Sequence, residues 1–203
     1  MNLLIKLFLP VSLLTWLSVR YVDQAVALLV RDYLFGSRQW SRLTSSLPDA
    51  LLLVVVAISL SAFISRLYRK RKLLLDAHTR FLGHIALSLP VSYGVRAVLK
   101  YAFGREITRA WILKPQFHEF HWFNGGAGYN GFPSGHMIVF ATLFAAIARY
   151  HPGFKLPCYL LLGLLALLLV ATNYHFVGDV IFGTYVGLLV EAGMEKVQPA
   201  GTC

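Results

Sequence analysis

The stretch LLLVVVAISLSAF, residues 51–63, decides the fold class of this chain. It contains no charged residue, and apart from two serines all of its side chains are apolar. With its flanks it extends from about Leu47 to Ile64, which approaches the roughly 20 apolar residues that an α-helix needs to cross a bilayer. The sequence therefore predicts a membrane-spanning helix at this position.

The composition of the whole chain agrees with a membrane protein. Of its 203 residues, 57% are hydrophobic and 14% are charged, whereas soluble domains carry about 25% charged residues. The formal net charge of +10 raises the question of a nucleic-acid partner, but so apolar a chain has little soluble surface to offer one. We expect no nucleic-acid partner, and we expect the basic side chains to contact anionic lipids of the bilayer.

Further apolar segments predict an all-α polytopic fold with six transmembrane helices in total. These segments cover about Leu3–Val19, His78–Leu99, Ser134–Arg149, Leu156–Thr172 and Val177–Val190. The first resembles a signal peptide, but no small-x-small cleavage site follows it, so we expect a retained anchor. Residues 1–203 are expected to form one membrane-embedded domain, with an anchor helix and an interfacial segment over 1–47 and the core bundle over 48–195.

A basic cluster after the second span, from Arg66 to Lys72, sets the expected orientation. Positively charged connections stay on the cytoplasmic side, so both termini are expected to face the cytoplasm as well. Residues 100–133 and the turn around 173–179 then lie on the outer face. The compact chain favours the inner membrane of a bacterium, where this outer face is periplasmic.

The stretch GFPSGHMIVF, residues 131–140, predicts an anion site at a helix start. Pro133 ends the preceding loop, Ser134 can cap the helix, and Gly135 lets backbone N–H groups approach a ligand. The positive end of the helix then faces the anion, and His136 lies within reach of it. A Ser-Gly pair at a helix start is also common as a plain cap, which is the simpler interpretation.

Two more polar clusters should reach the same membrane face. With six spans in this order, the end of the third, the start of the fourth and the turn between the fifth and sixth all emerge on the outer side. These points carry KYAFGREITR at 100–109, FPSGH at 132–136 and NYHFVGD at 173–179. The topology therefore predicts one composite site.

His175 and Asp179 are spaced to interact across one helical turn. The carboxylate can accept a hydrogen bond from one imidazole nitrogen, which leaves the other nitrogen as a nucleophile or base. Lys100, Arg105 and Arg109 supply positive charge, and phosphoryl transfer chiefly needs its oxygens neutralised and its nucleophile aligned. The alternatives are an interfacial histidine beside a helix-capping aspartate, and basic residues that contact lipid headgroups.

These clusters resemble, in order and orientation, the motifs of the type 2 phosphatidic acid phosphatase family, whose active site is related to that of vanadium haloperoxidases. The resemblance covers roughly residues 85–189. Pro-Ser-Gly-His at 133–136 is its specific part, and His-x3-Asp at 175–179 supports it. It implies a metal-independent membrane lipid phosphatase without a cofactor, which acts on lipid phosphates or diphosphates.

The resemblance also implies roles for the residues. His175 would be the nucleophile that forms a phosphohistidine, Asp179 would orient it, and His136 would protonate the leaving oxygen. The phosphate would be held by Lys100, Arg105 and the backbone of Ser134 and Gly135.

Two departures from the family pattern concern the phosphate clamp. Where Lys-x6-Arg-Pro is usual, the chain has Ile107 and Thr108, and where Ser-Arg precedes the third motif it has Leu168 and Leu169. We therefore expect Arg105 or Arg109 to replace the missing arginines. Asn173 can add a neutral hydrogen bond, which is weaker than a charge-assisted one.

The sequence is compatible with several functions. The expected substrate is an amphiphile with a phosphate at headgroup depth, undecaprenyl diphosphate before phosphatidylglycerol phosphate, phosphatidic acid or lipid A phosphates. The alternatives are a lipid-phosphate phosphotransferase and a non-catalytic lipid-binding or transport protein. His118, Glu119 and His121 have loose spacing for a zinc site, so we expect an aromatic interfacial loop and no metal there.

Overall fold

The structure is a computed structural model that describes residues 2–34, 47–74, 76–113, 120–126 and 128–197. These residues form helices and no strand, with one isolated bridge between Arg105 and Phe120. The predicted all-α fold class is confirmed. The helices are α1 Asn2–Lys6, α2 Phe8–Leu17, the π-helix Ser18–Val22, α3 Asp23–Leu34, α5 Leu47–Arg71, α6 Ala77–Phe103, α7 Thr108–Leu113, α8 Gly135–Tyr150, the 3-10 helix Pro152–Phe154, α9 Lys155–Ala171 and α10 Val177–Val197.

Within these described ranges, five stretches of helix are long and apolar enough to cross a membrane. They are Phe8–Tyr33, Ala50–Arg71, Ala77–Phe103, Pro152–Ala171 and Val177–Val197. The chain is therefore an integral membrane protein. The fourth predicted span is α8, whose 16 residues rise about 24 Å, less than the roughly 30 Å of a hydrocarbon core. The count of six spans thus stays a prediction.

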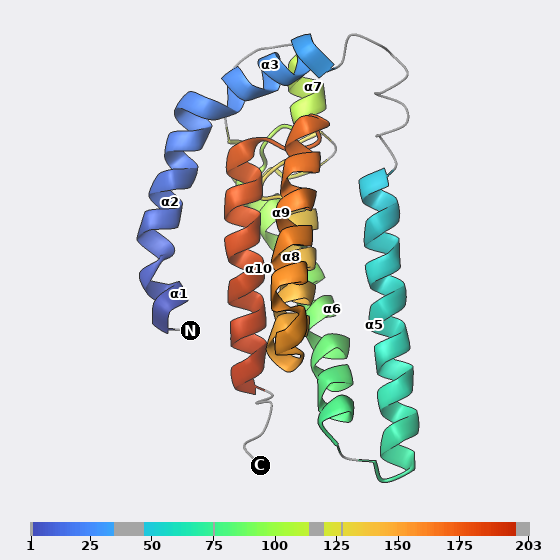
Figure 1. Cartoon of the computed structure of the whole chain (residues 1–203). Coiled ribbons are helices and arrows are strands. Elements are labelled where there is room, and N and C mark those ends of the chain that lie inside the picture. The colour runs from blue at the N-terminus through green and yellow to red at the C-terminus, as the bar shows by residue number, and fades with distance from the viewer. Residues whose placement is uncertain (1, 35–46, 75, 114–119, 127, 198–203) are drawn as a thin grey trace.

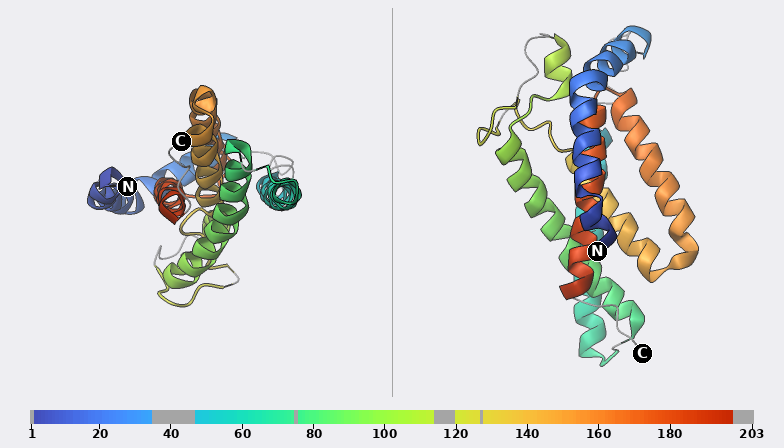
Figure 2. Two further views of the ribbon diagram at one scale, coloured as in Figure 1. Left: turned by 90° about the horizontal axis from the view of Figure 1, so that it is seen from below. Right: turned by 90° about the vertical axis from the view of Figure 1, so that its left-hand side faces the viewer.

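Helix α8 forms the centre of the bundle. It packs against α10, α6 and α9, and most of its residues are buried, including the apolar run from Met137 to Ala141. Seen from the side, α6 and α9 lie on opposite sides of α10, while α2 and α5 flank the bundle on its two other sides (Figures 1 and 2). A short helix at this position is surrounded by protein, so its ends need not match the bilayer thickness.

Two glycines let α10 approach α8 very closely. A Cβ atom at Gly183 would lie 2.6 Å from the carbonyl oxygen of Ser134, and one at Gly187 would lie 2.5 Å from that of Ile138. The hydroxyl of Thr142 donates to the carbonyl of Gly187 at 3.0 Å across this contact. Small residues four apart are a common means of bringing membrane helices together. This spacing in α10 fixes the separation of the two helices.

The N-terminal helix turns at the top of the bundle. The π-helix Ser18–Val22 joins α2 to α3, and α3 crosses over the end of the bundle toward α7 (Figure 1). Ala27 on α3 packs with Trp111 and Phe176 in a small buried cluster. Helix α3 therefore caps the end of the bundle where the polar clusters lie, and the interfacial segment predicted after the first span stays a prediction.

The α8–α10 contact predicts opposite effects for two glycine substitutions. Gly187→Ala should lower the free energy of unfolding by about 1–3 kcal/mol, the usual cost of overpacking. Gly163→Ala in α9 is the matched control, because a Cβ there meets nothing within 4 Å and alanine favours a helix by up to about 1 kcal/mol. Thermal unfolding in detergent measures both, and equal stability of the two variants would contradict the close approach.

Candidate active site

The three predicted polar clusters meet at one end of the bundle. The C-terminal end of α6, the N-terminal end of α8 and the turn between α9 and α10 all lie at the end that α3 and α7 cover (Figure 1). These segments therefore lie together, as the predicted topology requires.

Ser134 caps α8 as predicted. Its backbone is extended, at φ −61° and ψ 110°, and its hydroxyl accepts a hydrogen bond from the N–H of Met137 at 3.4 Å. Its own N–H donates to the carbonyl of Asp179 at 3.0 Å. That N–H, expected to hold phosphate, instead ties the start of α8 to the first turn of α10. This hydrogen bond forms because α8 and α10 lie so close together.

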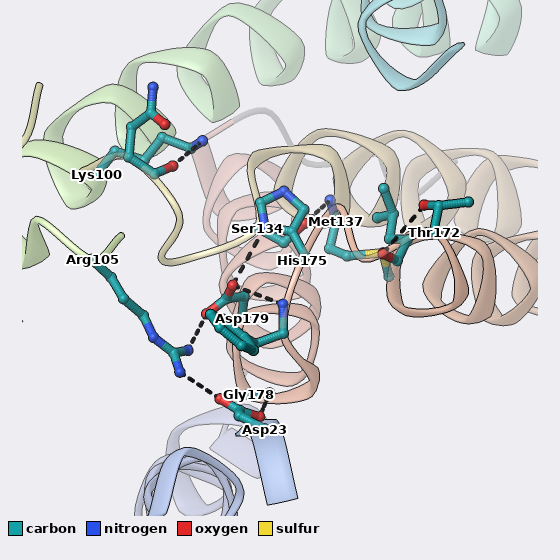
Figure 3. A network of polar contacts seen from close by, with 12 residues as sticks. Asp23, Lys100, Arg105, Ser134, Met137, Thr172, His175, Gly178 and Asp179 are labelled. Atoms are coloured by element: carbon teal, nitrogen blue, oxygen red, sulfur yellow. Dashed lines mark hydrogen bonds and ion pairs between the residues drawn. The ribbon is translucent and has the colours of Figure 1, made fainter. Parts of the chain in front are cut away.

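His175 and Asp179 form a close pair. Nδ1 of His175 lies 3.5 Å from Oδ2 of Asp179, and both side chains are buried. The same carboxylate oxygen accepts a hydrogen bond from the N–H of Phe176 at 3.1 Å. Figure 3 shows the imidazole directly above the carboxylate. The contact directs Nδ1 toward the acid, so Nε2 is the nitrogen that remains for chemistry.

The second histidine stands beside the first. The ring centroids of His136 and His175 are 5.8 Å apart, and the ring of Tyr174 lies 5.2 Å from that of His136. His136 is on the first turn of α8 and is buried. Two imidazoles at this distance can act on opposite sides of one small group.

A cavity of about 360 Å³ opens in front of His175. Three cations line it, Arg96 and Lys100 from α6 and Arg109 from α7, together with Tyr174 and Asn130. Lys100 Nζ donates to the carbonyl of Asn130 at 2.6 Å, and Arg109 Nη2 to that of Thr172 at 3.1 Å. So many positive charges around one cavity favour a multiply charged anion.

The pKa of His175 lies below its usual range. Burial is the main cause, and Lys100 and Arg96 lower it further, whereas Asp179 opposes them. His175 is therefore neutral near pH 7, which is the state in which an imidazole nitrogen is a nucleophile.

Arg96 is the cation that the sequence analysis missed. Its side chain lies against Gly135, and a Cβ at that position would clash with Arg96 Nε and Cδ. Gly135 was expected to let backbone approach a ligand, and its lack of a side chain also admits this arginine. Arg96 and Lys100 are four residues apart on α6, a spacing that points both to one face. A charged residue inside an apolar span, spaced four residues from Lys100, is the sequence signal that could have identified Arg96 as a site residue.

Comparison with known proteins gives one match. A family model described as the PAP2 superfamily matches residues 81–200. This chain belongs to the PAP2 superfamily. No curated protein matches the chain, and no solved structure does. Membership indicates a phosphatase that acts on phosphate esters, and the match takes in every residue of the cavity described above.

In this PAP2 superfamily member two predicted phosphate contacts lie elsewhere. The guanidinium of Arg105 is buried and donates to the carboxylates of Asp179 and of Asp23, the latter at 2.6 Å (Figure 3). The side-chain amide of Asn173 donates to the carbonyl of Ala27 at 3.1 Å. Both groups face α3, because that helix covers the end of the bundle. Arg109 alone of the two expected replacement arginines lines the cavity.

The loop histidines provide no metal site that the structure describes. His118 and Glu119 lie outside the described residues, and the ring of His121 contacts that of Tyr129 at 4.5 Å. Within the described ranges, no three His, Cys, Asp or Glu side chains are grouped so that they can hold a metal ion.

The cavity predicts that this PAP2 superfamily protein binds orthovanadate through Arg96. Arg96→Gln should weaken binding by about 1.5–3 kcal/mol, the contribution of a hydrogen bond to a charged group. Arg80→Gln is the matched control, since Arg80 lies exposed on the same helix. Titration calorimetry measures both dissociation constants. Equal constants for the two variants would remove Arg96 from the phosphate clamp.

Proposed function

We propose that the chain is a membrane lipid phosphatase that hydrolyses a phosphate monoester or diphosphate headgroup through a phosphohistidine. The observation that carries the proposal is the pair of buried imidazoles, 5.8 Å apart, of which His175 lines a cavity with three cations. Neutral nucleophile, candidate acid and phosphate-binding charges are thus present together. The family supports a phosphatase, and the membrane-spanning helices support a lipid substrate.

In the first step, Nε2 of His175 attacks phosphorus and the bond to the leaving oxygen breaks. Nδ1–H points to Asp179 Oδ2, and a small movement shortens their 3.5 Å separation to a hydrogen bond. The carboxylate stabilises the positive charge that the ring gains. His136 donates a proton to the leaving oxygen, so the product departs as a neutral hydroxyl or a protonated phosphate.

In the second step, water attacks the phosphohistidine. His136, now neutral, takes a proton from that water, and the bond between phosphorus and Nε2 of His175 breaks. Inorganic phosphate leaves and both imidazoles return to their starting states. Acid and base roles alternate on one residue, as microscopic reversibility requires.

The cations serve the transferred phosphoryl group. Arg96 and Lys100 from one side and Arg109 from the other surround the cavity, so they can neutralise the equatorial oxygens. Phosphoryl transfer is accelerated chiefly by such charge stabilisation and by alignment of the nucleophile. We propose that Arg96 takes the place of the arginines that the family pattern usually supplies.

A second hollow favours a diphosphate substrate. A hollow of about 350 Å³ adjoins the cavity, and Arg96, Lys100 and Asn130 line both. The same two cations can therefore contact two successive phosphates. We propose undecaprenyl diphosphate as the first candidate and phosphatidylglycerol phosphate as the second.

We further propose that the site faces the outside of a bacterial inner membrane. The basic residues 66–72 lie around the turn between α5 and α6, at the end of the bundle opposite the site (Figure 1). Positive charge marks the cytoplasmic side. The phosphate of a membrane lipid then reaches the cavity at headgroup depth on the other side, with both termini in the cytoplasm.

Phosphate release tests the proposal directly. Detergent-purified protein in EDTA should release phosphate from one or more of undecaprenyl diphosphate, phosphatidylglycerol phosphate, phosphatidic acid and lipid A. His175→Ala should reduce release by at least about 10⁴-fold, as loss of a nucleophile does. His78→Ala, a change of an exposed histidine on α6, should leave the rate unchanged.

Other outcomes point to the alternatives. Transfer of the phosphate to an added lipid acceptor, without free phosphate, would indicate a phosphotransferase. Vanadate binding without release from any lipid would indicate a binding or transport protein of the same fold. Activity that survives His175→Ala would overturn the phosphohistidine.

The pKa of His175 gives a pH prediction. Only neutral His175 attacks, so kcat/KM should rise with pH through a pKa below the usual 6.5. Lys100→Gln removes a positive charge that lowers this pKa, so the acid limb should move to higher pH. Lys72→Gln at the far end of the bundle should not move it. The same substrate is used for all variants, so its ionisation affects every pH profile equally. A shift of the Lys100→Gln acid limb to lower pH would contradict the proposed effect of Lys100 on the pKa of His175.

A further inference from the structure

Asp23, at the start of α3, is a fully enclosed carboxylate. Its Oδ1 accepts hydrogen bonds from the hydroxyl of Ser18 and from the N–H of Gly178, both at 2.8 Å. Its Oδ2 accepts a hydrogen bond from Arg105 at 2.6 Å. The residue is 1% exposed, so it is held in place from three directions, and Figure 3 shows its contacts with Arg105 and Gly178.

Arg105 connects this carboxylate to the histidine pair. One end of its guanidinium donates to Asp23, and the other end donates to Oδ1 of Asp179. The second oxygen of Asp179 faces Nδ1 of His175. The chain of contacts thus runs from α3, outside the family match at 81–200, to the proposed nucleophile.

We propose that Asp23 is a positioning residue for the proposed reaction, because it shares the charge of Arg105 and so keeps the Asp179 carboxylate available to His175. This inference rests on the proposed function.

The reason is electrostatic. In a buried site with a low effective dielectric, a guanidinium beside a single carboxylate cancels most of its field. With two carboxylates, Arg105 offsets only part of each charge. Asp179 therefore retains negative charge toward His175, whose ring becomes positive during attack on phosphorus.

Other charged and titratable groups around His175 act alongside this chain. They are Arg96 and Lys100 on α6, Arg109 on α7, His136 on α8 and Tyr174 in its own turn. Asp23 is linked to this group in two ways, through Arg105 to the carboxylate of Asp179 and through the N–H of Gly178, the residue before Asp179. Asp23→Asn keeps a side-chain oxygen that can accept from Gly178, so the loss of charge acts on His175 through Arg105 and Asp179.

Asp23→Asn keeps the size of the side chain and removes its charge. Arg105 is then paired with Asp179 alone and neutralises more of its charge. We expect kcat to fall by about 10- to 100-fold, similar to the loss when the hydrogen-bond partner of a metal-ligating side chain is removed. KM should stay within about twofold, because the cavity cations are unchanged. Asp32→Asn is the matched control, since Asp32 is an exposed residue of the same helix that pairs with Arg31.

A second measurement needs no turnover. Of the two protonation states of an imidazole, only the neutral one reacts with diethyl pyrocarbonate. The rate at which His175 is modified, measured by mass spectrometry over a range of pH, therefore reports the titration of His175. Asp23→Asn should move the midpoint to lower pH, because His175 loses part of the negative charge that favours its protonated form. The Asp32→Asn midpoint should match that of the unsubstituted protein.

The outcomes separate this inference from the proposed function. If the unsubstituted protein releases phosphate but Asp23→Asn equals it in kcat and in midpoint, only the inference fails. If no lipid is hydrolysed, the proposed function fails, and the midpoint still decides whether Asp23 acts on His175.

A size-matched pair guards against a purely structural role. Asp23→Glu retains the charge and Asp23→Gln does not, and both are compared as monodisperse protein in size-exclusion chromatography. Glu should give the higher kcat and the higher midpoint. If packing alone mattered, Glu and Gln would be equally impaired, and the inference would be overturned.

Discussion

The close approach of α10 to α8 is the contact on which the rest of this structure depends. Gly183 and Gly187 allow it, and the N–H of Ser134 bonds to the carbonyl of Asp179 where the two helices begin. His136 follows on one helix and His175 precedes the other, so the same contact sets the distance between the imidazoles. Packing in the membrane interior and geometry at the membrane surface thus have one cause.

Arg105 illustrates how burial constrains charge in such a site. A buried ion pair gains little net stability, whereas a partner removed from it leaves a charge that costs about 3–5 kcal/mol. Asp23, Asp179 and Arg105 together carry a net charge of −1. That negative charge lies next to His175, so it would stabilise a positive charge that forms on the imidazole.

The fold class, the meeting of three clusters and the cap at Ser134 could be predicted from the sequence, because hydropathy and helix-capping chemistry are local properties. The directions of Arg105 and Asn173 could not, since both depend on α3, a helix far away in the sequence that covers the end of the bundle. Arg96 was overlooked because it lies inside an apolar segment and outside the expected motif. The bounds of α8, Gly135–Tyr150, agree with the predicted segment Ser134–Arg149, because the cap and the apolar run that follows it are local signals.

The packing of Arg96 against Gly135 has a thermodynamic consequence. The N-terminal end of α8, against which Arg96 packs, carries partial positive charge from its backbone dipoles. Arg96, Lys100 and Arg109 add like charges around the cavity that Arg96 lines. An anion between these groups relieves their mutual repulsion. An anion bound at the proposed site would therefore stabilise the fold, by an amount that grows as RT ln(1 + [L]/Kd). The resistance of this protein to denaturation would then depend on the anions in its buffer as well as on the chain itself.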